Sequence, residues 1–272
     1  MKNQELTKEI TYPSILFRLK NDYYAVSCRN VVSIMQSPEV EALPEAPKNV
    51  IGIFRFMEKV IPVISLRSLF GIPSVEEEAN QLNHMLDARK QDHINWVKEL
   101  NHCTKCGELF TLAKDSHQCA LGRWFDQYKP ENNTVKIHLQ RLDEPHRKLH
   151  EAALKLDDCA EEERTRILNR VVSDYMPQVL AVLEETKKVF QEHKRTLLIV
   201  IHNGEHSFAM AVDEVLAVEE LQDVAAKEEV EKLKGSAYIT EIKKSPKLSR
   251  LVRLIEDDKL ACIAENYQLE QV

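Results

Sequence analysis

The chain has 272 residues, of which 43% are hydrophobic and 30% charged, so it can bury a core and wholesale disorder is excluded. The formal net charge of -7 argues against a nucleic-acid partner, which would normally call for a basic face. The polar start MKNQELTKEI and the lack of any run of about 18 apolar residues predict a cytoplasmic protein without direct membrane insertion. In that compartment the cysteines are expected as thiols or metal ligands rather than disulfides.

Strands and turns are predicted up to residue 73. The apolar runs are Ser14–Lys20, Tyr23–Cys28, Val50–Phe54 and Val60–Ile64. Asn21-Asp22, between the first two runs, is a turn signal. Pro62 lies inside the last run and lacks a backbone N–H, so it predicts an edge strand or a bulge there.

A helical block is predicted from Ser74, a candidate N-cap followed shortly by glutamates, to about Lys194. A one-sided stripe with helical spacing runs through Leu82, Met85, Leu86 and Arg89 to His93, Trp96, Val97 and Leu100. A long final helix is expected from Ala160 to Lys194. Pro177 should kink or interrupt it, because proline cannot donate the helical hydrogen bond.

The β pattern returns at Thr196. Two apolar runs at 197–202 and 207–212 flank Asn203-Gly204, a hairpin turn signal, and further strand candidates lie at 215–218, 237–239 and 251–255. Two short β halves would each have a thin core alone, which favours one β domain split by a helical insertion. We therefore predict an α+β multidomain chain, with a β domain at 10–74 and 195–272 and a helical insertion at 75–194.

The β segments resemble CheW-like chemotaxis coupling domains. The first block is EALPEAPKNVIGIFRFMEKVIPVISLRSLFGIP, and the second combines HSFAMAVDEVLAVEEL with GSAYITEI and LSRLVRLIEDDKL. The resemblance implies a double five-stranded β-barrel that bridges chemoreceptors to a histidine kinase without catalysing a reaction. Asp213, in the Val-Asp-x-Val stretch, is interpreted as a turn or hairpin residue rather than a phosphoacceptor or metal ligand. No acidic pair or receiver-like βα repeat surrounds it.

One loop departs from the CheW-like pattern. The family usually has Asn-x-Arg-Gly before the proline-containing strand and Asp before Leu-Arg. In this chain the aligned residues are Arg55-Phe-Met57-Glu58 and Ser65. Loss of the arginine and the glycine changes the charge and the turn geometry, so the receptor and kinase contacts of the family are put in question. A β-barrel with no chemotaxis role is the alternative.

Metal-ligating residue types are spread over the helical block. His146 and His150 form an H-x-x-x-H, and on a helix the two imidazoles share a face. Cys119 begins another predicted helix after Asp115-Ser116, which are capping candidates, and His93 lies on the first long helix. Tetrahedral zinc takes four thiolate or imidazole ligands, and a bundle core is a natural place for such a site.

Taken together, a His near Trp96, a Cys-x-Leu-Gly-x-Trp and the H-x-x-x-H resemble the chemoreceptor zinc-binding domain, in this chain as an inserted helical domain of four-helix-bundle type. The resemblance implies four ligands to Zn²⁺, which are His93, Cys119, His146 and His150. It also associates the centre with sensing oxidants such as hypochlorous acid, or zinc itself. Cys119 is then the expected redox switch, because oxidants attack the thiolate form.

Other donor groups leave alternatives open. Cys103-Thr-Lys-Cys106 is a C-x-x-C beside His102 and near His117, a candidate second metal or redox site that lacks a second half of the same type. The remaining cysteines, Cys28, Cys159 and Cys262, are expected to be inert.

The expected function is that of a signalling adaptor and not an enzyme. Its expected partners are a chemotaxis histidine kinase and the cytoplasmic tip of a chemoreceptor, and a homodimer through the helical domain is a further candidate. One alternative is a scaffold with purely structural zinc. The other is a zinc hydrolase, in which water replaces Cys119 and Glu151 is the general base. A sulfur ligand closes the site, and a closed site is typical of structural zinc.

Overall fold

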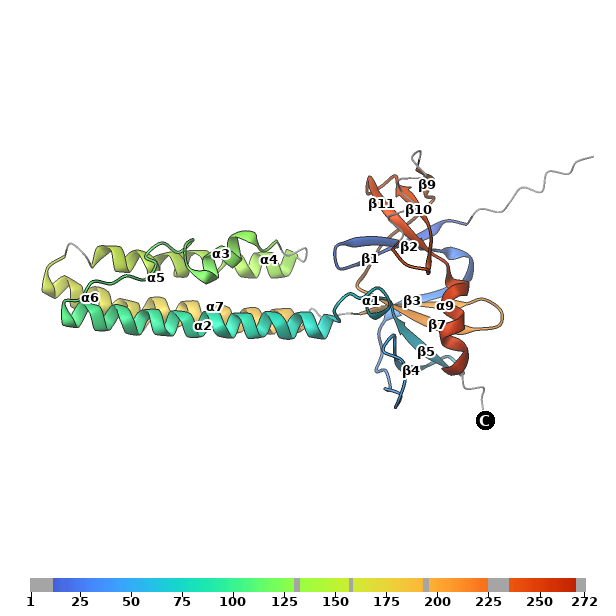
Figure 1. Ribbon diagram of the computed structural model, residues 1–272, viewed down its shortest axis with the longest axis horizontal. Coiled ribbons are helices and arrows are strands. Elements are labelled where there is room, and N and C mark those ends of the chain that lie inside the picture. The colour runs from blue at the N-terminus through green and yellow to red at the C-terminus, as the bar shows by residue number, and fades with distance from the viewer. Residues whose placement is uncertain (1–11, 130–132, 157–158, 193–195, 225–234, 268–272) are drawn as a thin grey trace, which may run out of the picture. The chain divides into compact units, whose positions relative to one another are not determined.

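The computed structural model describes residues 12–129, 133–156, 159–192, 196–224 and 235–267. The chain forms two compact units, Met1–Ser74 with Arg195–Val272, and Val75–Lys194 (Figure 1). The predicted domain limits at 10, 194, 195 and 272 lie outside the described residues and stay predictions. Within the described part of the chain, no helix combines the length and the apolar character needed to cross a membrane.

The first unit contains two β-sheets. The six-stranded sheet has the order β8-β1-β2-β11-β10-β9 and is built from β1 (Ser14–Leu19), β2 (Asp22–Ser27), β8 (Glu214–Glu219), β9 (Gln222–Asp223), β10 (Ile239–Ser245) and β11 (Arg250–Ile255). The five-stranded sheet has the order β3-β6-β7-β5-β4 and is built from β3 (Val31–Gln36), β4 (Val50–Phe56), β5 (Lys59–Ser65), β6 (Leu197–His202) and β7 (Ser207–Val212).

Both sheets combine strands from the two sides of the helical insertion. β1 pairs with β8 and β2 with β11, while β3 pairs with β6 and β5 with β7. The predicted α+β chain with a split β domain and a helical insertion is therefore confirmed. One sheet differs from the expected five strands because the two-residue β9 extends it beyond β10. Each sheet, as formed by the described strands, has an edge strand at both ends, so neither sheet closes on itself.

The edge strand predicted from Pro62 is not observed. β5 lies inside its sheet, between β7 and β4. The parallel pairing of β5 with β7 begins at Val63, one residue after Pro62. Pro62 therefore lies outside the residues that pair with β7. The predicted irregularity is present nearby as a register shift in the β4–β5 pair, between Val50 and Gly52.

The main core of this unit lies where the two sheets meet α9 (Asp257–Ala264). Phe17 of β1, Ile64 of β5, Phe208 of β7 and Leu260 of α9 are all buried in one apolar cluster. Short helical turns complete the unit at η1 (Cys28–Asn30), α1 (Leu66–Leu69) and η3 (Glu265–Tyr267). Because the cluster takes residues from before and after the insertion, neither half can bury its apolar face without the other.

The second unit is helical. Its elements are α2 (Val75–Cys106), α3 (Ala120–Gln127), α4 (Asn133–Gln140), α5 (Asp143–Lys155), α6 (Glu161–Arg170), η2 (Val171–Tyr175) and α7 (Met176–Glu192). Figure 1 shows α2 running alongside α7, and α4 and α5 also pack on α7. Trp96 and Leu100 of α2, Leu149 of α5 and Leu183 of α7 are buried in a shared core. With α4–α5 and α6–α7 each taken as one interrupted helix, the described residues of this unit form four helical segments.

The interruption expected at Pro177 takes the form of a π-helical turn. η2 separates α6 from α7, and the N–H of Met176 bonds to the carbonyl of Val171, five residues earlier. Pro177 follows at the second position of α7. A proline removes one helical N–H and crowds the carbonyl four residues back, and the widened turn relieves that clash.

Candidate metal centre

Four side chains from three helices converge in the core of the helical unit. His93 lies on α2, Cys119 precedes α3, and His146 and His150 lie one turn apart on α5. One donor atom from each lies within 4.8 Å of all the others. The three histidines are buried, between 1% and 5% exposed. The structure thus brings together all four residues expected to ligate zinc.

The distances between the donor atoms fit a tetrahedral site. The Nε2 atom of His93 lies 3.1 Å from His146 Nε2 and 3.4 Å from His150 Nε2. Cys119 Sγ lies 3.2 Å from His146 Nε2 and 3.9 Å from His93 Nε2. A zinc tetrahedron has N–N edges of about 3.3 Å and S–N edges of about 3.6 Å, if Zn–N is about 2.05 Å and Zn–S about 2.3 Å. These four distances lie within about 0.4 Å of those edges.

The hydrogen bonds of the ring nitrogens also call for a cation. His93 Nδ1 lies 2.8 Å from the Arg89 carbonyl, and His150 Nδ1 lies 3.0 Å from the Ala113 carbonyl. A carbonyl accepts, so both Nδ1 atoms carry the proton and both Nε2 atoms present lone pairs. Two buried lone pairs that face each other at 3.4 Å repel unless a positive charge stands between them.

Cys119 is the N-cap of α3. Its Sγ accepts the N–H of Gly122 at 3.2 Å, the position at which a capping side chain normally accepts. The sequence analysis named Asp115 and Ser116 as the capping candidates for this helix. In the structure Asp115 accepts the N–H of His117, in the turn before the helix. Gly122 has no room for a side chain, because a Cβ there would lie 1.8 Å from the Ser116 carbonyl oxygen. Because residue 122 is glycine, the Ser116–His117 turn can lie in direct contact with α3. This turn precedes Cys119, whose sulfur lies among the donor atoms of the centre.

Trp96 holds the loop that closes the centre. Its Nε1 donates to the Ala113 carbonyl at 2.9 Å, the same oxygen that receives the Nδ1 proton of His150. The Trp96 ring also lies 4.8 Å from the His150 ring, centre to centre. Sequence reasoning placed Trp96 in the core, where it lies, but missed this bond. The sequence signal for a role of Trp96 near the centre was its position three residues after His93, because residues at this spacing share one face of a helix.

Burial sets the proton affinities of the centre. It lowers the pKa of His93, and it lowers the pKa of His146 to about 3 and that of His150 to about 4, with neighbouring histidines adding to the shift. Burial also raises the pKa of the Cys119 thiol, and this effect outweighs the backbone N–H groups of Gly122 and Leu121, which lower that pKa. The histidines are therefore neutral and ready to coordinate at pH 7, whereas the thiolate needs a bound cation.

The C-x-x-C residues separate in the structure. Cys103 is 4% exposed and turns into the core, with its Sγ 3.5 Å from Glu99 Oε1. Cys106 is exposed and lies in a group with His102 and Glu108. His117 instead pairs with Asp126, at 3.0 Å.

The candidate hydrolytic base does not face the buried donors. Glu151 accepts from Arg147 Nη1 at 2.5 Å, and its side chain is 41% exposed. It lines a polar surface cavity of about 320 Å³ together with Lys148 and Tyr175. A general base must reach the proton that it abstracts, so this position gives no support to the hydrolase alternative.

Two family models match consecutive stretches of the chain. A family model described as the CheW-like domain matches residues 13–92, and one described as the chemoreceptor zinc-binding domain matches residues 93–156. The chain combines a CheW-like domain with a chemoreceptor zinc-binding domain. The second match begins at His93 and contains the four donor residues, whereas α6, α7 and the strands after residue 195 lie beyond both matches.

A curated relative supports the first assignment. It is the chemotaxis protein CheW of Helicobacter pylori (strain ATCC 700392 / 26695), which is 32% identical over 78 residues. The match covers 29% of this chain and 46% of the relative, so the chain matches less than half of the relative's length.

Two solved structures are distant neighbours. The scaffolding protein TtCheW from Thermoanaerobacter tengcongensis has a TM-score of 0.40 and 11% identity, covering 94% of this chain and 90% of that one. The regulatory CZB domain of DgcZ has a TM-score of 0.35 and 17% identity, covering 43% of this chain and 99% of that one. These scores are too low to identify a fold.

Two further residues of the CheW-like resemblance have structural roles. Ser65 stands where the family usually has Asp, and it caps α1 by accepting the N–H of Ser68 at 3.1 Å. Serine and aspartate are both good N-caps, so this replacement keeps the local structure. Asp213 accepts from Arg67 Nε and from Lys20 N, both at 2.7 Å, in agreement with a role in the fold.

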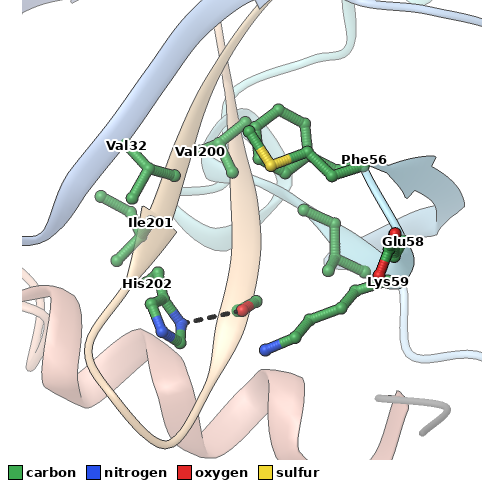
Figure 2. A pocket seen from close by; sticks show the side chains of 10 residues that line it. Val32, Phe56, Glu58, Lys59, Val200, Ile201 and His202 are labelled. Atoms are coloured by element: carbon green, nitrogen blue, oxygen red, sulfur yellow. Dashed lines mark hydrogen bonds between the residues drawn. The ribbon is translucent and has the colours of Figure 1, made fainter. Parts of the chain in front are cut away.

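The altered loop of the CheW-like domain borders an apolar pocket (Figure 2). Met57 has a positive φ of 53° and is 79% exposed, so a bulky side chain occupies a backbone conformation that favours glycine. The pocket has a volume of about 450 Å³. Its lining comes from β3, β6, β7 and the β4–β5 turn, and includes Val32, Phe56, Glu58, Lys59, Val200, Ile201 and His202.

Proposed function

We propose that this protein is a cytoplasmic chemotaxis adaptor whose CheW-like domain links a chemoreceptor tip to a histidine kinase, and whose helical domain holds Zn²⁺ and reports oxidant or zinc to that domain. The observation that carries the proposal is the convergence of four buried or half-buried donors, with tetrahedral spacing, inside an insertion of the CheW-like domain.

His93, Cys119, His146 and His150 would hold the ion, and the mixed imidazole and thiolate set suits zinc over magnesium or calcium. Bound zinc would keep Cys119 as a thiolate at neutral pH. The carbonyls of Arg89 and Ala113 fix the two imidazoles that they contact, so these donors stay aimed at the centre. With all four positions taken by protein groups, the site is of the closed type.

Cys119 is the residue that we propose as the redox switch. Its thiolate and one molecule of hypochlorous acid would give a sulfenic acid and a chloride ion. The sulfur is oxidised by two electrons and the chlorine is reduced. The product has lost the negative charge that bound the cation, and it is also a poorer acceptor for the Gly122 N–H that begins α3.

The proposed route from the switch to the CheW-like domain combines helix packing with the covalent connection from α7 to β6. α5, which carries His146 and His150, packs against both η2 and α7. α7 precedes β6 in the chain, and β6 is an internal strand of the five-stranded sheet. A shift of α3 relative to α5 would therefore reach the sheet through α7.

The adaptor role is tested by co-purification. The zinc-loaded full chain is incubated with the purified regulatory domain of a chemotaxis kinase and with a receptor cytoplasmic fragment. We expect binding to one or both. Met57→Arg with Glu58→Gly restores the arginine and the glycine of the family loop, and should strengthen binding if the altered turn weakens it. No binding to either partner, with or without these substitutions, removes the adaptor function. Light scattering on the same samples tests the homodimer.

The sensor role is tested on the reconstituted receptor–kinase assembly. Mild hypochlorous acid should change kinase output with the wild type, and mass spectrometry should locate the first oxidation at Cys119. Cys119→Ser should abolish the response, while Cys262→Ser, which removes an exposed cysteine of α9, should leave it intact. A response that survives Cys119→Ser places the switch elsewhere. Bound zinc with no effect on output leaves a scaffold with structural zinc.

A further inference from the structure

A second group of metal-binding side chains lies at the end of α2. His102 and Cys106 are four residues apart, so both project from one face of the last turn. Gly107 then adopts a left-handed conformation, with φ of 69°. The turn returns the chain across the helix end, where the N–H of Glu108 bonds to the carbonyl of Cys103 at 2.9 Å. This ending brings the Glu108 carboxylate beside the other two side chains.

The three side chains form a compact donor set. One donor atom each from His102, Cys106 and Glu108 lies within 4.8 Å of the others, and all three residues are exposed. His102 Nδ1 lies 3.8 Å from Cys106 Sγ, and His102 Nε2 lies 3.8 Å from Glu108 Oε2. Small rotations of exposed side chains would place one nitrogen, the sulfur and one oxygen around a single ion at low cost.

The position on the helix also favours a cation. The last carbonyls of a long helix carry partial negative charge, which stabilises positive charge within the final turn. A metal ion bound by the side chains of this last turn would supply such a positive charge.

From this arrangement we propose that His102, Cys106 and Glu108 form a second, solvent-exposed Zn²⁺ site. Imidazole and thiolate select zinc over magnesium and calcium. Three protein donors leave one position for water or an exogenous ligand, so this site should exchange its ion more readily than a closed one. It lies nine residues beyond His93 on the same helix, or roughly 14 Å along the axis. The proposal does not depend on the buried centre.

The C-x-x-C pair does not provide the same site. Cys103 points into the core, where its Sγ contacts Glu99 and the Leu109 carbonyl. A metal held by Cys103 and Cys106 together would have to draw a buried sulfur out to the surface. The donor set of the structure therefore replaces Cys103 with His102 and Glu108.

The test is a zinc titration of the metal-free full chain with ZnCl₂, in competition with a chromophoric chelator. The wild type should bind two equivalents, the second more weakly. His102→Ala with Cys106→Ser should abolish the second equivalent and keep the first. Glu108→Gln should weaken the second by roughly tenfold, because the neutral amide is a poorer ligand. Cobalt(II) at the second equivalent should give a thiolate-to-metal absorption band that is absent in Cys106→Ser.

Two control variants separate this site from the buried centre. Cys119→Ser with His146→Ala should lose the tight equivalent and keep the weak one, and Cys262→Ser should keep both. A wild type that binds a single equivalent overturns the proposal. So does a weak equivalent that survives His102→Ala with Cys106→Ser, or one that is lost only in Cys103→Ser.

Discussion

Arg67 and Asp213 join the two segments of the β unit by a bidentate ion pair. Arg67 Nε donates to Asp213 Oδ1 at 2.7 Å and Nη2 donates to Oδ2 at 2.6 Å, across 146 residues of sequence. The side chains are 11% and 19% exposed. Arg67 Nη1 also donates to the Pro73 carbonyl at 2.6 Å, one residue before Ser74, where the first unit reaches the insertion. The pair therefore fixes both the contact between the halves and the chain segment that leads into the helices.

Asp213→Ala should lower the stability of the β unit by about 3 kcal/mol, because it leaves a largely buried guanidinium without its partner. Glu214→Ala is the matched control. Glu214 pairs with Arg18 at 2.7 Å, but its side chain is 49% exposed, so the loss should stay below about 1 kcal/mol. Urea denaturation followed by far-UV circular dichroism measures both. Equal losses would show that the Arg67–Asp213 pair holds the two halves together no better than an exposed ion pair does.

Replacing residues 76–192 with a short flexible linker should leave a folded β protein. Both sheets and their core are made from residues outside this segment. The expected result is a cooperative thermal transition and a dispersed amide spectrum by NMR. The same replacement with Asp213→Ala should melt at a lower temperature. A soluble product with a molten spectrum would mean that the helical unit is required for the β domain to fold.

The buried centre should bind one tight equivalent of zinc. His146→Ala should remove most of that affinity and lower the thermal midpoint of the zinc-loaded protein, because binding to the native state adds to its stability. His84→Ala is the control, since His84 is an exposed histidine on the same helix as His93. Zinc content after gel filtration and calorimetry report the outcome. Unchanged zinc content in His146→Ala would contradict the assignment of His146 as a zinc ligand.

The sequence predicted most of the arrangement where the signal was local or a motif. Hairpins followed from turn residues such as Asn203-Gly204, and the four donors from the resemblance to the chemoreceptor zinc-binding domain. The Arg67–Asp213 pair could not be predicted from the sequence, because no local pattern indicates a contact across 146 residues. Cys119 was placed at the start of its helix, but its capping role was assigned to better-known capping residues. The C-x-x-C suggested one site, whereas helix geometry buries one thiol and exposes the other.

Gly122→Ala should destabilise the helical unit, although glycine to alanine normally stabilises a helix by about 1 kcal/mol. The added methyl group would meet the Ser116 carbonyl oxygen at 1.8 Å, so the Ser116–His117 turn must move and carry Cys119 with it. Zinc affinity should fall together with the thermal midpoint. Gly107→Ala is the control, because its Cβ meets open space and only the backbone conformation is strained. A stabilised Gly122→Ala would contradict the close approach of this turn to α3.

The metal-free protein should lose stability as the pH falls below about 6.5. The pKa of His146 is lowered to about 3 and that of His150 to about 4, chiefly by burial. The unfolded chain then binds more protons than the folded one between pH 6.5 and these values, so the stability present above pH 6.5 declines on acidification. Thermal midpoints at pH 7.5, 6 and 5 test this. His146→Gln, which does not titrate, should show a shallower decline, and an equal decline would contradict the assignment.

The π-helical turn at Val171–Tyr175 has a consequence for the spacing of the final helix. A π turn holds about one residue more than an α turn, so it acts as a single-residue insertion in an otherwise regular helix. The apolar positions of α6 and of α7 therefore follow different phases, about 100° apart around the axis. Removal of one residue from this turn would join the two phases. Either Val179 and Leu183 of α7 or the facing residues of α6 would then rotate away from the core, while the composition of the helix stayed almost the same.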